Sequence, residues 1–259
     1  MSIDWNSTQA AIWRPASAQL RAVRRLDSVR FDELLGIERQ CAAFKNNIEA
    51  FLRGERANNM LLWGSRGTGK SSLIKAALNH YGPQGLRVIE IDKDDLANLC
   101  EVVDELHELP QRFIIFCDDL SFDEGETAYK HLKSVLEGSI ELPPENVLVC
   151  ATSNRRHIIT EHNSDNSGVD LINGELHYGD TVEEKLSLAD RFGLWLAFHP
   201  NNRAQYLAIV DSLFVGFSGD REALHLSAKQ FAMTRASKSG RTARQFWLQW
   251  RAADESSVL

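Results

Sequence analysis

A glycine-broken loop at residues 64–71 carries the residue types that bind phosphate. It reads GSRGTGKS, follows the apolar run MLLW and opens the helical pattern SSLIKAAL. Gly64 and Gly69 can adopt torsions that turn successive N–H groups toward an anion, and the N-terminus of the following helix adds its dipole. Lys70 can reach the β- and γ-phosphates, and the hydroxyl of Ser71 can ligate Mg²⁺. The alternative, a glycine turn with a surface lysine, is disfavoured because an apolar strand pattern precedes the loop and a helix pattern follows it.

The candidate phosphate-binding site extends over nine consecutive residues. Backbone N–H groups supply most of the expected contacts, and Thr68 adds a hydroxyl to the loop. The residues expected to bind the phosphates are Gly64, Ser65, Arg66, Gly67, Thr68, Gly69, Lys70, Ser71 and Ser72.

A pair of carboxylates follows the apolar run RFIIFC, as Asp118 and Asp119. Ligands of open α/β sheets bind at the carboxyl ends of the strands, so the pair is expected beside the phosphate loop. Asp118 would bind Mg²⁺ through water, and Asp119 would orient or deprotonate an attacking water. The alternative is an aspartate that caps a helix after the strand. Because aspartate is one methylene shorter than glutamate, Asp119 also predicts slow hydrolysis.

Two further polar side chains stand at strand ends or corners. Asn154 ends the run VLVCATSN, where its carboxamide could contact both the attacking water and the γ-phosphate; the alternative is an ordinary turn residue. Arg191 precedes the apolar run GLWLAF and could stabilise a transferring phosphoryl group in a neighbouring subunit. It could instead face a helix C-terminus beside Asp190.

The C-terminal stretch SGRTARQFWLQW supplies one more candidate arginine. A helix is expected to begin near Thr242, and Arg244 on it could reach back to the phosphates. Arg241 is the rival for this role, and a surface arginine packed on Phe246 or Trp247 is the alternative. The candidate catalytic residues are therefore Asp119, Asn154, Arg191 and Arg244.

The elements that must position these residues alternate along the chain. Continuous apolar runs predict strands covered on both faces, and the helical patterns between them suit parallel crossovers. The predicted strands are 60–63, 86–91, 112–117, 147–151 and 193–198, and the predicted helices are 37–53, 70–80, 94–107, 126–137 and 182–190. The pattern predicts an α/β three-layer sandwich around a five-stranded parallel sheet.

The two ends of the chain have a different character from this alternating centre. Residues 1–27 are polar and are expected to form an N-terminal arm with a short helix at 17–26. The α/β nucleotide-binding core would span 28–200, and an all-helical lid would span 201–259. The polar segment 160–181 is expected to be a flexible surface insertion.

The composition is that of an ordinary soluble protein, with 43% hydrophobic and 25% charged residues. No apolar run is long enough for a membrane span, and the N-terminus lacks the pattern of a secretory signal. Four scattered cysteines and eight histidines without metal-ligand spacing favour a reduced, cytoplasmic protein without a zinc site. The net charge of −7 argues against a protein built to coat nucleic acid, although the segments LRAVRRL and NRRH are basic.

The ordered motifs FDELLGIERQ, GSRGTGKS, FIIFCDD, ATSN, LADRFG and GRTARQF resemble those of AAA+ ATPases. Within that superfamily the chain is similar to a bacterial family of uncharacterised AAA+ ATP-binding proteins. That family shares the pattern ANN-x-LLWG-x-RGTGKSSL and the pattern F-CDDLSF. The resemblance extends over residues from about 28 to 252.

The resemblance implies a P-loop NTPase sandwich with strand order 5-1-4-3-2, a helical lid, and ATP or ADP with Mg²⁺ between lid and core. It implies that Ser71 and Asp118 hold the metal, that Asn154 senses the nucleotide, and that Arg191 acts as an arginine finger in a homo-oligomer. It also places the segment from Leu35 to Ile37 near the adenine.

These expectations support an ATPase that remodels or assembles a protein partner, which the sequence does not identify. An ATP-gated binding module or loader with slow turnover is the alternative. A P-loop kinase is disfavoured because no motif for an acceptor substrate is visible.

Overall fold

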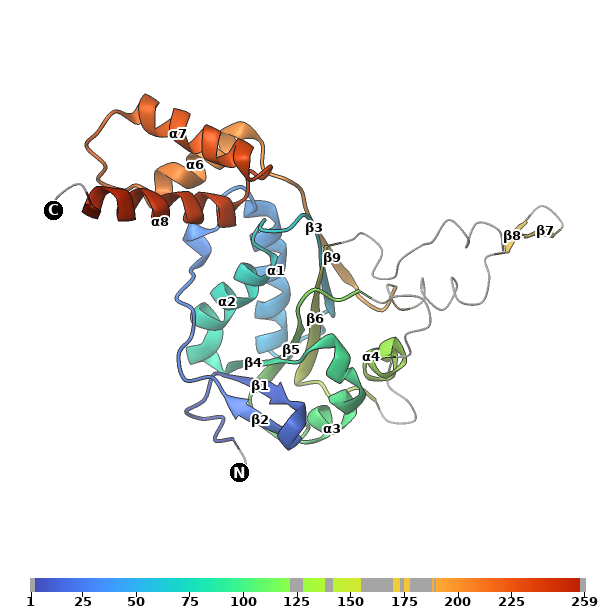
Figure 1. Ribbon diagram of the computed structural model, residues 1–259. Coiled ribbons are helices and arrows are strands. Elements are labelled where there is room, and N and C mark those ends of the chain that lie inside the picture. The colour runs from blue at the N-terminus through green and yellow to red at the C-terminus, as the bar shows by residue number, and fades with distance from the viewer. Residues whose placement is uncertain are drawn as a thin grey trace.

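The computed structural model describes residues 3–121, 128–137, 142–154, 170–172, 175–177, 188 and 190–256. In chain order it contains an N-terminal hairpin, an α/β layer structure and three C-terminal helices (Figure 1). Among the described helices, none has the length and apolarity needed to cross a membrane.

A seven-stranded sheet forms the centre of the fold, in the order β2-β1-β4-β5-β6-β3-β9. Strands β1 and β2 pair antiparallel, and every other neighbouring pair in this sheet is parallel. The strands are β1 (Ala10–Arg14), β2 (Gln19–Ala22), β3 (Met60–Gly64), β4 (Leu86–Glu90), β5 (Arg112–Cys117), β6 (Val147–Ser153) and β9 (Leu194–Phe198).

The predicted count of five strands is wrong, although the predicted order of those five is confirmed. They correspond to β9-β3-β6-β5-β4, which is the order 5-1-4-3-2. The two additional strands come from residues 1–27, where a polar arm with a helix at 17–26 was expected. Strand β2 lies at the sheet edge, where Leu20 packs against the core while Gln19 and Arg21 are exposed. Its composition is therefore that of a solvent-facing edge strand.

Helices cover both faces of the sheet. On one face lie α1 (Glu38–Leu52) and α2 (Lys70–Tyr81), and on the other lie α3 (Leu99–Asp104) and α4 (Ala128–Glu137). Four 3₁₀ segments connect these elements: η1 (Pro15–Ser17), η2 (Phe31–Glu33), η3 (Gly82–Gln84) and η4 (Lys93–Asn98). The predicted helix 94–107 is therefore divided between η4 and α3.

Two sequence predictions fall largely outside the described residues. They are the helix at 182–190, of which residues 188 and 190 are described as helical, and the flexible insertion at 160–181. Within the latter, β7 (Asp170–Ile172) and β8 (Glu175–His177) form an antiparallel pair.

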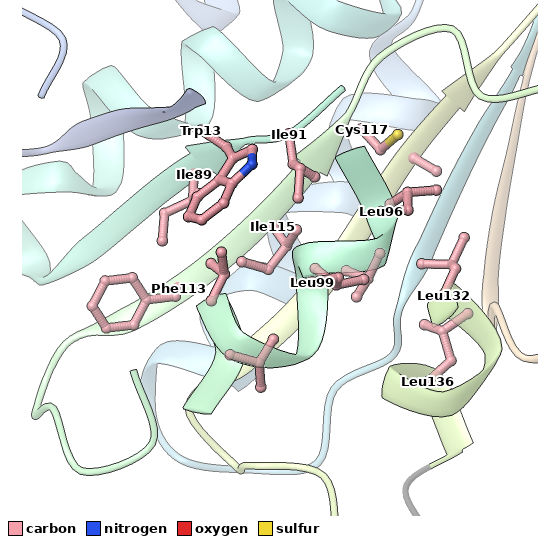
Figure 2. Close-up of a cluster of buried hydrophobic side chains, with 14 of the residues drawn as sticks. Trp13, Ile89, Ile91, Leu96, Leu99, Phe113, Ile115, Cys117, Leu132 and Leu136 are labelled. Carbon is pink, nitrogen blue, oxygen red and sulfur yellow. The ribbon is translucent and has the colours of Figure 1, made fainter. Parts of the chain in front are cut away.

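The central strands are apolar throughout because both of their faces are buried. In β5, Phe113, Ile115 and Cys117 point into the core beneath α3 and α4 (Figure 2). The alternate residues Ile114 and Phe116 point into the core beneath α1 and α2. This two-sided burial accounts for the continuous apolar run that predicted a covered parallel strand.

A buried arginine fastens the N-terminal segment to the sheet. The Arg87 side chain, on β4, is 7% exposed. Its guanidinium donates hydrogen bonds to the carbonyl oxygens of Trp5 at 2.7 Å, Gly82 at 2.8 Å and Leu86 at 2.8 Å. The Trp5 ring packs edge-on against Phe113, with ring centroids 5.0 Å apart. These contacts make the residues before β1 part of the core.

The C-terminal helices α6 (Arg203–Leu213), α7 (Arg221–Thr234) and α8 (Gly240–Ser256) share a hydrophobic core of their own. Asn202 caps α6 through a hydrogen bond from the Gln205 N–H, and Asp220 caps α7. The buried residues of this cluster include Tyr206, Val210, Leu224, Ala228 and Phe246.

We predict that Arg87→Met lowers the free energy of unfolding by about 2 to 3 kcal/mol, because three buried carbonyls lose a charged donor. Urea unfolding of the whole chain measures this loss. Arg21→Met is the matched control, because Arg21 is exposed and, among the described residues, its side chain makes one hydrogen bond, 3.4 Å long, to the neighbouring Ala22 carbonyl. Equal stability of the two variants would contradict the role given to Arg87.

Candidate functional site

The loop after β3 turns sharply against the neighbouring edge strand. Gly64 has a φ of +128°, and a Cβ atom there would lie 2.0 Å from the carbonyl oxygen of Phe198 on β9. The Ser65 N–H donates to that same oxygen at 3.0 Å. Only glycine tolerates so close an approach of two backbones, so the first glycine of the loop is required by its packing on β9.

Lys70 is the first residue of α2, and its side chain is 7% exposed. Its Nζ donates to the carbonyl oxygens of Gly64 at 2.7 Å and Ser65 at 2.8 Å, and to Asn154 Oδ1 at 3.2 Å. The structure therefore brings together Lys70 and Asn154, two of the candidate site residues. Three acceptors match the three donors of an ammonium group.

Burial is the main cause that lowers the pKa of Lys70 below its ordinary value. The charges of Asp118 and Asp119 act in the opposite direction, and those of Arg66 and Arg241 lower it further. These four charged groups therefore all lie within electrostatic range of the ammonium. The Lys70 ammonium, which lies among carbonyl oxygens and carboxylates, is a suitable hydrogen-bond donor for phosphate oxygens.

Two hydroxyls converge on the first carboxylate. Ser71 Oγ donates to Asp118 Oδ1 at 2.8 Å, and Thr152 Oγ1 donates to the same oxygen at 2.5 Å. Hydroxyl and carboxylate oxygens are hard ligands of the type that Mg²⁺ prefers, usually alongside phosphate oxygens and water. Among the described residues, no group of three or more histidine, cysteine or acidic side chains is arranged so that it could hold a metal ion by itself. The donor set at Ser71 and Asp118 thus fits an ion that shares its shell with a phosphate ligand.

The second carboxylate, Asp119, lies at the centre of several polar contacts. Its backbone φ is +55°, a left-handed conformation that aspartate tolerates better than most residues. Asn154 Nδ2 donates to Asp119 Oδ1, and a guanidinium nitrogen of Arg66 lies 3.8 Å from Asp119 Oδ2. Asp119 therefore faces the phosphate loop, together with Asn154.

Thr152 also belongs to this candidate site, although its place in the sequence did not single it out. Its hydroxyl donates to Asp118 and accepts from the backbone N–H of Asp119 at 2.9 Å. Its carbonyl accepts from the N–H of Leu120 at 2.7 Å. Thr152 is 1% exposed, and its hydrogen bonds hold the turn that carries both carboxylates. The only sequence signal was its place two residues before Asn154, at the polar end of an apolar strand.

The start of α8 contacts the tip of the phosphate loop. The Gly240 N–H donates to the carbonyl oxygen of Gly67 at 3.2 Å, and a Cβ on Gly67 would lie 2.7 Å from Ser239 Oγ. That hydroxyl also accepts from the Thr242 N–H at 3.2 Å. The helix begins at Gly240, two residues before the predicted start near Thr242.

This start places Arg241 beside the loop. A Cβ atom added to Gly67 would lie 3.4 Å from the Cβ atom of Arg241. Arg244 is exposed further along α8, and its side chain makes no hydrogen bond or ion pair with any residue that the structure describes.

The remaining candidates surround this centre. Thr68 Oγ1 donates to the Ser65 carbonyl at 2.7 Å, so this hydroxyl braces the loop. Ile37 Cδ1 lies 3.1 Å from the Cβ position of Gly69 and therefore contacts the loop from the α1 side. Ser72 is half-buried in the first turn of α2. Arg191 is exposed at the corner before β9, held by its N–H to the Leu188 carbonyl at 3.2 Å.

A pocket of about 440 Å³ lies between the phosphate loop and the C-terminal helices. The loop contributes Ser65, Arg66 and Thr68 to its wall, and the connection to α6 contributes Pro200 and Asn201. The segment that joins α7 to α8 closes the other side. The phosphate loop, the connection to α6 and the C-terminal helices thus line one space.

The profile of the family described as "Protein of unknown function (DUF815)" matches residues 6–254. No curated protein gave a match. The crystal structure of the FIGL-1 AAA domain in complex with ADP is 18% identical to this chain, with a TM-score of 0.54, and the match covers 85% of this chain and 71% of that one. A mutant of Thermotoga maritima RuvB is 13% identical, with a TM-score of 0.51 and coverage of 84% and 71%. These similarities show that the chain has the α/β fold of AAA-type P-loop domains.

We predict that Thr152→Val lowers the free energy of unfolding by about 1 to 2 kcal/mol, because the Asp119 N–H loses its acceptor. Thr152→Ser keeps the hydroxyl and is the matched control. Urea unfolding compares the three proteins, and a valine variant as stable as the wild type would mean that this hydroxyl does not hold the turn.

Proposed function

This chain belongs to the DUF815 family, and we propose that it is an AAA+ ATP-binding protein that hydrolyses ATP with the help of Mg²⁺. One observation carries the proposal. Lys70, Ser71, Asp118 and Asn154 arise from three separate segments, and hydrogen bonds join Lys70 to Asn154 and Ser71 to Asp118. Such a grouping has no evident use in stabilising the sheet, whereas each member has a role toward a nucleoside triphosphate.

The loop would bind the phosphates through its backbone N–H groups, the N-terminus of α2 and the Lys70 ammonium. The residues from Gly64 to Ser72 are expected to contact the phosphates, and the adenine of the nucleotide would lie toward Ile37. Because Lys70 already has three acceptors, binding requires phosphate oxygens to replace the carbonyl oxygens of Gly64 and Ser65.

Hydrolysis would be an in-line displacement by water. The water oxygen forms a bond to the γ-phosphorus while the bond from that phosphorus to the β,γ-bridging oxygen breaks. The water proton goes to the Asp119 carboxylate, and ADP and inorganic phosphate are released. Asn154 would hold the water through its carboxamide. Ser71 and Asp118 would hold Mg²⁺, which when bound neutralises charge on the phosphates.

We propose that the protein acts as a homo-oligomer, in which Arg191 of one subunit contacts the nucleotide of its neighbour. The exposed position of Arg191 at a structured corner supports this role. The helices of 201–259 would act as a lid on the core of 28–200, with a protein partner remodelled as the lid moves. Arg241 beside Gly67 is better placed than Arg244 to connect the lid with the phosphates.

A second candidate function is an ATP-gated binding module or loader with slow turnover. The observation that favours it is the state of Asp119, which is short, lies in a left-handed backbone conformation and has both carboxylate oxygens in polar contacts. A carboxylate held in this way is less able to approach an attacking water than the longer side chain of a glutamate.

One experiment tests the proposal and separates the two candidates. We expect Mg²⁺-dependent release of phosphate from ATP, with a rate per subunit that rises with protein concentration. Lys70→Ala should abolish the activity, because the principal cation at the phosphates is removed. Arg191→Ala should reduce the rate by about 100-fold or more at high concentration, in line with other trans-acting arginines.

A rate that is independent of concentration and unchanged in Arg191→Ala would contradict hydrolysis assisted by a neighbouring subunit. Tight ATP binding without phosphate release would favour the loader. Activity retained in Lys70→Ala would mean that the loop does not bind the phosphates.

A further inference from the structure

Arg66 lies at the tip of the phosphate loop. It lies between Ser65, which packs against β9 through its N–H, and Gly67, which accepts a hydrogen bond from the start of α8. The backbone on both sides is therefore held in place, whereas the Arg66 side chain is 76% exposed. Because its backbone is fixed and its cationic side chain is long and exposed, Arg66 can reach more than one anion near the loop.

A chain of polar contacts leads from Lys70 to Arg66. The Lys70 ammonium contacts Asn154 Oδ1 at 3.2 Å, Asn154 Nδ2 donates to Asp119 Oδ1, and Asp119 Oδ2 lies 3.8 Å from Arg66. The two cations of the loop, Lys70 and Arg66, lie at the ends of this series of contacts. Between them lie Asn154 and Asp119, the amide and the general base proposed for hydrolysis. Arg66 therefore occupies the open end of the proposed catalytic group.

The ion pair between Arg66 and Asp119 is weak, so another anion can take the place of Asp119. Their side chains are 76% and 58% exposed, and such surface pairs stabilise a protein very little. A terminal phosphate carries more charge than a carboxylate and offers several oxygens to the planar guanidinium fork. When a nucleoside triphosphate binds the loop, its γ-phosphate and Asp119 would compete for the same arginine.

We propose that Arg66 is an arginine supplied in cis, which passes from Asp119 to the γ-phosphate when a nucleoside triphosphate binds. This inference rests on the proposed function and gives the side chain of Arg66 a specific role in it. The transfer has two consequences. The γ-phosphate gains a cation from the loop itself, and the Asp119 carboxylate loses its ion-pair partner and becomes free to accept a hydrogen bond from the attacking water. ADP lacks the γ-phosphate, so it leaves the pair with Asp119 in place.

The test compares the binding of two magnesium complexes, those of ADP and of the non-hydrolysable β,γ-imido analogue of ATP. We expect Arg66→Ala to weaken the binding of the imido analogue by about tenfold and that of ADP by less than about twofold. The kcat for ATP should fall by at least about tenfold. Arg66→Lys should restore part of the binding, since it keeps the charge without the fork. Arg21→Ala, an exposed arginine on β2, is the control and should change none of these values.

Equal losses for both nucleotides in Arg66→Ala would overturn the proposal, since they would mean that Arg66 only shapes the loop. Unchanged binding of both with unchanged kcat would overturn it as well. If the wild-type protein binds neither complex, the proposed function itself fails, and this result is distinct from the other two.

Discussion

The buried ammonium of Lys70 is the constraint on which the candidate site depends. A charged group that is 7% exposed must be surrounded by acceptors, because the free-energy cost of burying it unpaired is large. Its acceptors come from the end of β3, from the loop that follows and from the end of β6. These groups meet only because β6 lies directly beside β3.

The order of the sheet supplies the rest of the site. Strand β5, which is followed by the two carboxylates, lies on the other side of β6 from β3. Strand β6 is thus placed so that Thr152 and Asn154 can reach both carboxylates and the lysine. On the opposite side of β3, β9 presents the Phe198 carbonyl that forces the loop to begin with glycine. The start of α8 completes the enclosure through its contact with Gly67.

Much of this arrangement could be predicted because its signals are local. The loop at 64–71, the carboxylates after an apolar strand and Asn154 each stand in a context of strand, turn or helix that a few neighbouring residues reveal. The two N-terminal strands were not predicted. Strand β2 is an edge strand and carries the polar residues of a surface arm. Strand β1 is largely buried, but it is only five residues long and stands between polar segments of the sequence. Thr152 was not found because its role depends on pairing with a distant strand. The choice between Arg241 and Arg244 could not be made from the sequence, because it depends on where α8 begins. A helix turns by about 100° per residue, so an error of two residues at its start changes which side chains face the loop.

The central claim is that the loop, the lysine and the paired carboxylates bind one nucleoside triphosphate together with Mg²⁺. Titration calorimetry of the whole chain with ATP, with and without Mg²⁺, tests it most directly. The account predicts saturable binding of one ATP per chain that is tighter with Mg²⁺, because Ser71 and Asp118 hold the ion against the phosphates. The absence of saturable binding, or binding that Mg²⁺ does not strengthen, would contradict it.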